Sequence, residues 1–240
     1  MLGEILALLN AVLWAASVVT IRKSIERYNF LSVSLVIASV GTIISWPLTL
    51  LLSFNKPFNP TGLMIFVVAG LLHPTVSRLL FFRGVEKLGA AVNASIFAMY
   101  PLFGALTAIL LLREELKATI LVGLASVVTG AVLVHVAKMH GKLGGSGSRL
   151  ETGLIIPATA AVITGLGYTV KKMGLNLYDE PVLGVALGFT ASLLVYIPPV
   201  ILSQRVRAYA SDVKGAFKLF WKPSIGIYFG GLLSFYALRY

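Results

Sequence analysis

A histidine lies inside a long apolar segment at residues 62–82, where an ionisable side chain is costly and marks a functional candidate. This residue, His73, is followed by Pro74. An unperturbed imidazole titrates at about pH 6.5, so His73 could sense or relay a proton. Alternatively, its ring caps carbonyl groups that Pro74 leaves without a hydrogen bond, because proline has no N–H. Since the same segment contains no acidic residue, the capping interpretation is favoured.

Two arginines, Arg78 and Arg239, occupy matching places in two similar parts of the sequence. Two guanidinium groups that faced one cavity would suit an anionic substrate such as a carboxylate or phosphate. Alternatively, each side chain lies near the end of an apolar segment and extends to the lipid headgroups. The headgroup interpretation is favoured, because a long basic side chain reaches the interface easily from such a position.

Other polar and aromatic residues share faces of the expected helices. Asn10, Trp14 and Ser17 follow an i, i+4, i+7 spacing, so an indole for stacking and an amide for hydrogen bonding could line a cavity. Alternatively, the three residues hold helices together. Similar faces elsewhere would suit a small amphipathic solute, or would belong to the aromatic belt of the membrane interface. These further candidates are Asn93, Phe97, Tyr100, Thr164, Tyr168 with Lys171 one turn further, Tyr228, Phe235 and Tyr236.

Motifs of enzymes are absent from the sequence. It has no glycine-rich loop followed by Lys and Ser or Thr, no paired His on a helix, and no Gly-x-Ser-x-Gly turn. The absence of cysteine rules out disulfides and thiolate metal sites. We therefore expect a protein that is not an enzyme and that uses neither a metal nor a cofactor. Any transport by this chain alone would be secondary, because no ATP site is visible.

Composition identifies an integral membrane protein. Hydrophobic residues make up 58% of the 240 residues and charged residues only 12%, with a mean hydropathy of +0.90. A soluble domain carries about twice that charged fraction. The net charge of +11 does not indicate nucleic-acid binding, because the basic residues lie in short gaps between apolar runs. Basic residues in the loops between spans orient multi-pass proteins in the cell membrane.

A membrane-spanning helix needs about 20 mostly apolar residues, and eight segments meet or nearly meet this length. They are Gly3–Ile21, Leu31–Phe54, Gly62–Phe82, Ala90–Leu112, Thr119–Ala137, Gly153–Val170, Val182–Leu202 and Ser224–Leu238. A Gly- and Ser-rich stretch at residues 139–150 is the expected linker between two halves.

The two halves repeat one another. An offset of 150 lays Gly3–Ile25 over Gly153–Leu175, and a one-residue gap then places Pro47 on Pro198. Further along, at an offset of 161, Gly70 matches Gly231. Internal repeats of membrane-spanning units are typical of secondary transporters, whose substrate site lies at the repeat interface.

The number of spans predicts that the repeat is inverted. The first repeat, residues 1–138, holds five spans, so the second enters the membrane with the opposite orientation. The second repeat, residues 151–240, holds only three. We therefore expect a ten-helix protein of which this chain contains eight spans; the alternative is a genuine eight-span protein.

Basic residues also bear on orientation in the membrane. Thirteen Lys and Arg fall in gaps on one side, and six on the other, with Lys171 and Lys172 among the six. The excess places the N-terminus outside by the positive-inside rule.

Residues 90–134 carry a family resemblance. They read AAVNASIFAMYPLFGALTAILLLREELKATILVGLASVVTGAVLV. A helix with small residues and Pro101, a charged hairpin at Glu114, and a helix with Gly123 and Gly130 resemble the EamA-type branch of the drug/metabolite transporter (DMT) superfamily. The first helix also fits, with Trp14 followed by small residues and a basic end. The resemblance implies an alternating-access carrier of small metabolites, amino acids, nucleoside-type compounds or drugs, with homodimer contacts near the two glycines.

Two departures from the family leave questions open. The related four-helix multidrug transporters keep a proton-carrying glutamate in their first helix, whereas Trp14 or Ala15 stands there in this chain and Thr164 in the second copy. A proton or another coupling ion therefore stays undecided. The family usually begins in the cytoplasm, opposite to the basic-residue count, so orientation stays open as well.

The sequence thus predicts an all-α integral membrane protein with an inverted repeat of five-transmembrane-helix units. Its expected function is secondary transport, as an exporter or permease of small metabolites or of amino-acid- or drug-like solutes. Its expected partners are the solute, the lipid bilayer, a coupling ion and a second copy of the chain. The alternatives are a membrane-embedded enzyme or flippase for a lipid-linked substrate, and a non-transporting scaffold. An enzyme would need an acid-rich cluster at one interface, and the sequence shows none.

Overall fold

The structure is a computed structural model that describes residues 2–25, 28–53, 57–115, 118–139, 150–210 and 212–240. Within these ranges almost every residue is helical and no β-strand is found. The prediction of an all-α protein is confirmed. The expected Gly- and Ser-rich linker falls almost entirely on residues 140–149, which lie outside the described ranges.

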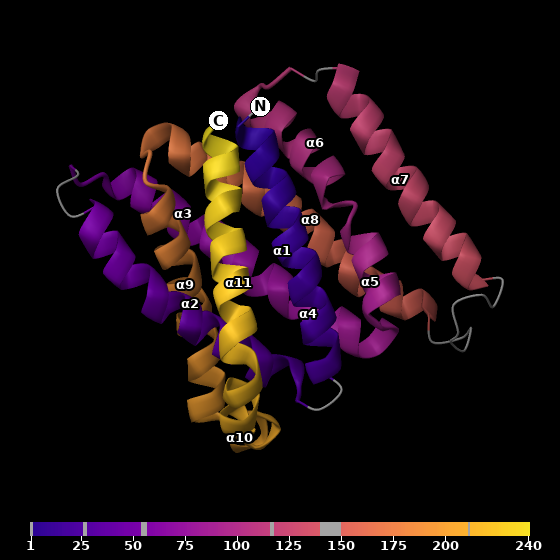
Figure 1. The fold of residues 1–240 in the computed structure, drawn as a ribbon, viewed down its shortest axis with the longest axis vertical. Helices are drawn as coiled ribbons and strands as arrows, with labels where there is room; N and C mark the ends of the chain where they lie inside the picture. Colours follow the sequence, from indigo (N-terminus) through magenta and orange to yellow (C-terminus); the bar gives the residue numbers. More distant parts are fainter. Residues whose placement is uncertain (1, 26–27, 54–56, 116–117, 140–149, 211) are drawn as a thin grey trace. The chain divides into compact units, whose positions relative to one another are not determined.

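The described residues of each predicted span are helical, apart from breaks at His73 and at residues 98–99, and several helices are longer than expected (Figure 1). Helix α8 continues for seven residues past the predicted end at Val170, and α11 begins eleven residues before Ser224. The elements are α1 (Leu2–Ile25), α2 (Phe30–Ser53), α3 (Pro60–Gly70), η1 (Leu71–Val76), α4 (Ser77–Leu88), α5 (Ala90–Phe97), α6 (Tyr100–Leu112), α7 (Ala118–Met139), α8 (Leu150–Leu177), α9 (Pro181–Leu202), α10 (Gln204–Tyr209) and α11 (Val213–Arg239).

Five helices in the described part of the chain are long and apolar enough to cross a membrane. They are Phe30–Ser53, Pro60–Leu88, Ala90–Leu112, Gly153–Leu177 and Pro181–Leu202. Helices α1 and α7 contain shorter apolar stretches, Leu2–Ser17 and Ala118–Leu133. A multi-pass membrane protein follows from these lengths, since each long helix matches the thickness of a bilayer.

Local signals in the sequence set several helix ends. The side chain of Asn59 accepts a hydrogen bond of 3.0 Å from the backbone N–H of Gly62, and Pro60 occupies the first turn of α3. Pro181 begins α9 in the same way. Gly89 separates α4 from α5 with a φ of 80°, a conformation that costs glycine nothing.

The chain forms two compact units. Unit 1 consists of Met1–Thr75 and Val170–Tyr240, and unit 2 of Val76–Thr169. Two long helices therefore pass from one unit into the other, one at η1 and one within α8.

In unit 1, α2 packs on both α9 and α11, α3 packs on α9, and α1 packs on α11. Helices α1 (indigo in Figure 1) and α11 (yellow) run antiparallel, because the first turn of α1 at Gly3 meets Ala237 and Tyr240. Small and β-branched residues of α2, among them the fully buried Val33 and Ile37, form one part of the core, beside fully buried aromatic residues of α3 and α11 such as Phe66 and Tyr228. The small residues allow helices to approach closely.

In unit 2, α4 packs on α5 and α5 packs on α7. Helices α6 and α8 approach closely at two glycines, since a Cβ on Gly165 would lie 2.5 Å from the backbone nitrogen of Gly104. Near this crossing, the hydroxyls of Thr107 and Thr169 lie 2.6 Å apart. Glycines and threonines are typical of helix contacts in membranes.

Candidate functional site

The segment η1 interrupts the helix that runs from α3 to α4. His73 has φ −141° and ψ 114°, outside the helical region, and Pro74 follows it. In a regular helix the N–H of residue 74 would bond to the carbonyl of Gly70, which proline cannot do. The hydroxyl of Thr75 donates to that carbonyl instead, at 2.7 Å. Thr75 thus supplies a hydrogen to this carbonyl, and capping by His73, the interpretation favoured from the sequence, stays a prediction.

Helix α9 holds the interrupted segment in place. The hydroxyls of Thr75 and Ser192 lie 2.9 Å apart, and the hydroxyl of Tyr196 donates to the carbonyl of Thr75 at 2.6 Å. All three side chains are buried. Gly188 allows the close approach, because a Cβ there would lie 3.2 Å from the ring of Pro74. The helix break at η1, called the kink below, is thus held against α9 by hydrogen bonds that are costly to break in an interior with little water.

A buried lysine contacts the kink from α8. Lys171 is 3% exposed, and its Nζ lies 2.9 Å from Nδ1 of His73. The same ammonium lies 5.0 Å from the centroid of the Phe235 ring, within the range of cation–π attraction. A protonated imidazole and an ammonium are both donors only, so their hydrogen bond requires that at most one of the two be cationic. This trio, Lys171, His73 and Phe235, is called the basic centre below.

The sequence pattern placed Lys171 and Lys172 in a gap between spans, and this placement is wrong. Both residues lie inside α8, whose apolar span continues to Leu177. A basic pair resembles the end of a span, because Lys and Arg are frequent in the gaps between spans. The spacing of Thr164, Tyr168 and Lys171, at i, i+4 and i+7, was the available sign that Lys171 continues the helix.

Aromatic rings surround the basic centre within unit 1. The ring of Phe66 lies 5.9 Å from that of Phe235 and 6.5 Å from that of Tyr178. Glycines make room for these rings: a Cβ on Gly174 would lie 2.6 Å from the Phe66 ring, and one on Gly184 would lie 2.5 Å from the Phe235 ring. Rings seated on helix backbones in this way are held rigidly.

Predicted candidates on α1 and α11 also belong to unit 1. The hydroxyl of Ser17 donates to the carbonyl of Leu13 at 2.7 Å, and Oδ1 of Asn10 lies 3.0 Å from where a Cβ on Gly230 would stand. Asn10 therefore faces α11. Tyr228 is fully buried, and its hydroxyl has no hydrogen-bond partner among the described residues. An unsatisfied buried hydroxyl is costly and marks a position where a ligand or water is expected.

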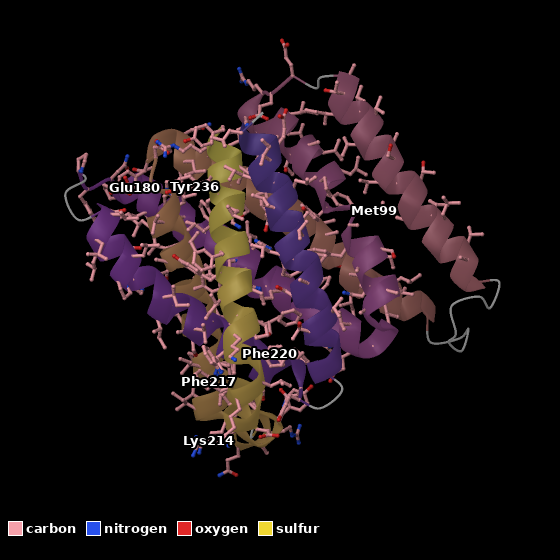
Figure 2. All side chains as sticks on the ribbon, viewed as in Figure 1. Met99, Glu180, Lys214, Phe217, Phe220 and Tyr236 are labelled. Atoms are coloured by element: carbon pink, nitrogen blue, oxygen red, sulfur yellow. The ribbon has the colours of Figure 1, made fainter. Side chains whose placement is uncertain are left out.

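Trp14 and Tyr236 are both half-buried. Figure 2 shows Tyr236 near the C-terminal end of α11 and Glu180 where α9 begins. Lys214 and Phe217 lie at the other end of α11 (Figure 2).

Polar contacts close the end of unit 1 at which α9 begins. Arg239 forms an ion pair of 2.6 Å with Asp179, and both side chains are partly exposed, at 39% and 50%. The hydroxyl of Ser53 donates to the carboxylate of Glu180, and the side chain of Asn59 donates to the carbonyl of Leu177 at 3.0 Å. Arg239 thus uses a carboxylate at a helix end.

Arg78, its match in the repeat, lies in unit 2 and is 5% exposed. That the two arginines face one cavity remains a prediction, as does extension of Arg78 to the headgroups.

Unit 2 brings together four aromatic residues from α4, α5, α6 and α8. The ring of Phe97 lies 4.7 Å from Phe81 and 5.5 Å from Tyr100. Tyr100 and Tyr168 stack at 5.6 Å with an interplanar angle of 20°. The predicted candidates Tyr100 and Tyr168 are therefore neighbours, on rings that could stack with a planar group.

Two buried polar candidates of unit 2 are engaged in helix packing. Nδ2 of Asn93 donates to the carbonyl of Phe81 at 3.0 Å, while its Oδ1 has no partner within the described ranges. A Cβ on Gly84 would lie 1.8 Å from that oxygen, so glycine is required there. The hydroxyl of Thr164 meets that of Ser77.

The positions predicted to be structural behave differently from one another. Pro101 lies in the first turn of α6, next to the break between α5 and α6 at residues 98–99. Glu114 is half-buried in the loop after α6. A Cβ on Gly123 or Gly130 would meet no atom within 4 Å among the described residues. Close packing at these glycines is therefore not found among the described residues.

Residues able to hold a metal ion do not gather anywhere in the described part of the chain, where no group of three or more His, Asp or Glu is found.

Comparisons with known proteins agree with the fold. A solved structure described only as "Crystal structure of protein" is 17% identical, covers 98% of this chain and 84% of its own, and superposes with a TM-score of 0.57. At that identity the likeness shows the fold alone. No curated protein matches the chain. The model of the EamA-like transporter family matches residues 1–136, more than half of the sequence. Together with the membrane-spanning helices, this match shows that the chain is a multi-pass integral membrane protein of the EamA-like transporter family, within the DMT superfamily.

Proposed function

We propose that the protein is a secondary transporter that exports or takes up a small organic solute by alternating access, and that the eight predicted spans of this chain belong to two inverted repeats of a five-helix unit. Residues 1–138 form the first repeat and residues 151–240 the second. The helices rock around a central site that opens to one side of the membrane and then to the other. Bound solute shifts the population between these states according to its differential affinity.

The basic centre is the observation that carries this proposal. Lys171 and His73 are ionisable residues inside spans of an EamA-like protein, and Lys171 is buried. Ionisable groups at membrane depth are costly and typically mark a substrate or ion pathway. The interrupted helix at His73 strengthens the proposal, since discontinuous helices form the substrate sites of many carriers.

Packing within unit 1 supports the inverted repeat. The sequence offsets pair α2 with α9 and α3 with α11. A two-fold axis that exchanges these partners maps the contact between α2 and α11 onto the contact between α9 and α3, and both contacts are present. The same axis would pass through the contact of α2 with α9, which is also present.

Thermal unfolding of the detergent-purified protein tests the proposal. Ligands that bind the folded state raise its apparent stability by mass action. Amino acids, nucleosides, sugar phosphates and cationic drugs form the panel, and we expect a shift confined to one chemical class. Loss of that shift in Trp14→Ala would support the cavity role of Trp14. If folded protein responds to no solute, the alternatives of a lipid-linked enzyme, a flippase or a scaffold gain weight.

A further inference from the structure

We infer that the basic centre binds the carboxylate group of a monoanionic solute, and that Lys171 supplies the charge. The inference rests on the proposed transport function and specifies its substrate class. It follows from three features of unit 1: the charge that the centre carries, the aromatic wall beside it, and the bond that the carboxylate replaces.

The first feature is the charge. Nζ of Lys171 lies 2.9 Å from Nδ1 of His73, so the pair carries no more than one positive charge while the hydrogen bond exists. A monocarboxylate matches that charge. A phosphate dianion would leave one negative charge uncompensated in a medium of low dielectric constant, which is expensive.

The second feature is the apolar wall. Phe235 is 4% exposed and lies under the ammonium, and fully buried Phe66 lies beyond it. An ammonium over one ring, with a second ring behind it, offers a polar contact and an apolar surface side by side. That combination suits a small acid with an aromatic or apolar body.

The third feature is the ability of Lys171 to exchange one hydrogen-bond acceptor for another. A lysine ammonium has three N–H donors that rotate together, so it can turn from one acceptor to another without backbone movement. A carboxylate oxygen is a stronger acceptor than an imidazole nitrogen, because its bond is charge-assisted on both sides. The carboxylate takes the place of His73 as acceptor. Its arrival thereby removes the hydrogen bond between Lys171 of α8 and His73 of η1, and so couples binding to the interrupted segment.

Matched pairs of ligands test this inference on the full-length protein in detergent. Thermal unfolding is measured with phenylacetate, indole-3-acetate and lactate, each beside its uncharged amide, and with inorganic phosphate. We expect at least one acid to stabilise the wild-type protein, while its amide and phosphate have no effect at the same concentration. Lys171→Met should weaken binding of that acid about tenfold or more, since it removes a charged hydrogen bond.

Lys172 provides the control. It is the neighbouring residue on the same helix and is only half-buried, so Lys172→Met should leave the affinity within about twofold. Lys171→Arg keeps the charge and should retain part of the binding. If Lys171→Met does not fold, two measurements still test the inference. They are the comparison of acids with amides on the wild-type protein and the acid affinity of the Lys171→Arg variant.

Several outcomes would overturn the inference. Equal stabilisation by acid and amide, or unchanged acid affinity in Lys171→Met, removes the role of Lys171. Stabilisation by neutral or cationic solutes only, with every acid inactive, refutes the carboxylate site and leaves the transport function intact. Failure of every solute class, in protein shown to be folded, removes both proposals.

Discussion

Replacing Gly70 with alanine should force α3 away from α9 beside the kink. A Cβ on Gly70 would lie 2.6 Å from Cα of Gly188 and 3.3 Å from its nitrogen. Both are backbone atoms, so no side-chain rotation relieves the clash. Ordinary contact begins at 3.4 Å, and the helices must therefore separate locally by about 0.8 Å, the difference between 3.4 Å and 2.6 Å.

The separation has an estimable cost. Overpacking of a well-packed interior costs about 1–3 kcal/mol, and a clash with backbone atoms belongs near the upper end. Alanine regains about 1 kcal/mol over glycine within a helix. The net loss of stability is then about 1–2 kcal/mol, which corresponds to a fall in Tm of about 2–8 °C for a chain of this size.

Gly123→Ala is the matched control. A Cβ at Gly123 meets no atom within 4 Å among the described residues, so the helix gains alanine without a clash. Its Tm should be unchanged or rise by a few degrees, and the propensity gain is the same in both variants. Thermal unfolding of the purified variants in one detergent measures the difference. A Gly70→Ala protein at least as stable as Gly123→Ala would refute the close approach of α3 and α9.

Two further substitutions test contacts in unit 1. Tyr196→Phe removes the donor to the carbonyl of Thr75 at the kink, and the buried acceptor left without a partner should lower the free energy of unfolding by about 1–3 kcal/mol. Tyr240→Phe, at an exposed ring, should leave the stability unchanged. Equal effects of the two variants would contradict this assignment. Asp179→Asn breaks the ion pair with Arg239 at a partly exposed helix end, so it should cost less than about 1 kcal/mol. That small loss should disappear at about 1 M salt, where charges are screened; a loss that persists there would show that the pair is not an exposed one.

The all-helical type of the fold could be predicted from the sequence because the bilayer imposes it, whereas the number of eight spans stays a prediction, since five helices in the described residues are long and apolar enough to cross a membrane. Inside a bilayer, where no water is present, the backbone N–H and C=O groups must form their hydrogen bonds within each helix. The length of an apolar segment alone therefore indicates a span. Ends of spans are less certain, because a lysine has two ways of being accommodated. At Arg239 the charge lies at an exposed position at a helix end. At Lys171 it lies inside the unit, on a helix that continues to Leu177.

A break in the helix at His73 could be predicted from the sequence, and the partners of the residues around it could not. Pro74 after His73 indicates a break in the helix, since proline has no backbone N–H to donate. Which group repairs the break depends on a neighbour two residues after His73 and on α9, a helix more than 100 residues away. Periodicity along one helix contains no information about such pairs. The repeat itself is the only sequence signal here that relates distant helices to one another.

The contrast between the kink and the basic centre links these contacts to transport. The kink is fastened to α9 by Thr75, Ser192 and Tyr196, which are uncharged groups whose hydrogen bonds do not depend on a solute. Its contact with α8 depends on Lys171 and His73, two ionisable groups whose hydrogen bond an anion can replace. In a carrier, a segment that moves must keep one of its contacts with neighbouring helices while another contact changes when the solute binds. Under the proposed transport function these two requirements fall on different partners of η1: α9 would provide the lasting attachment, and Lys171 of α8 would provide the contact that the carboxylate replaces.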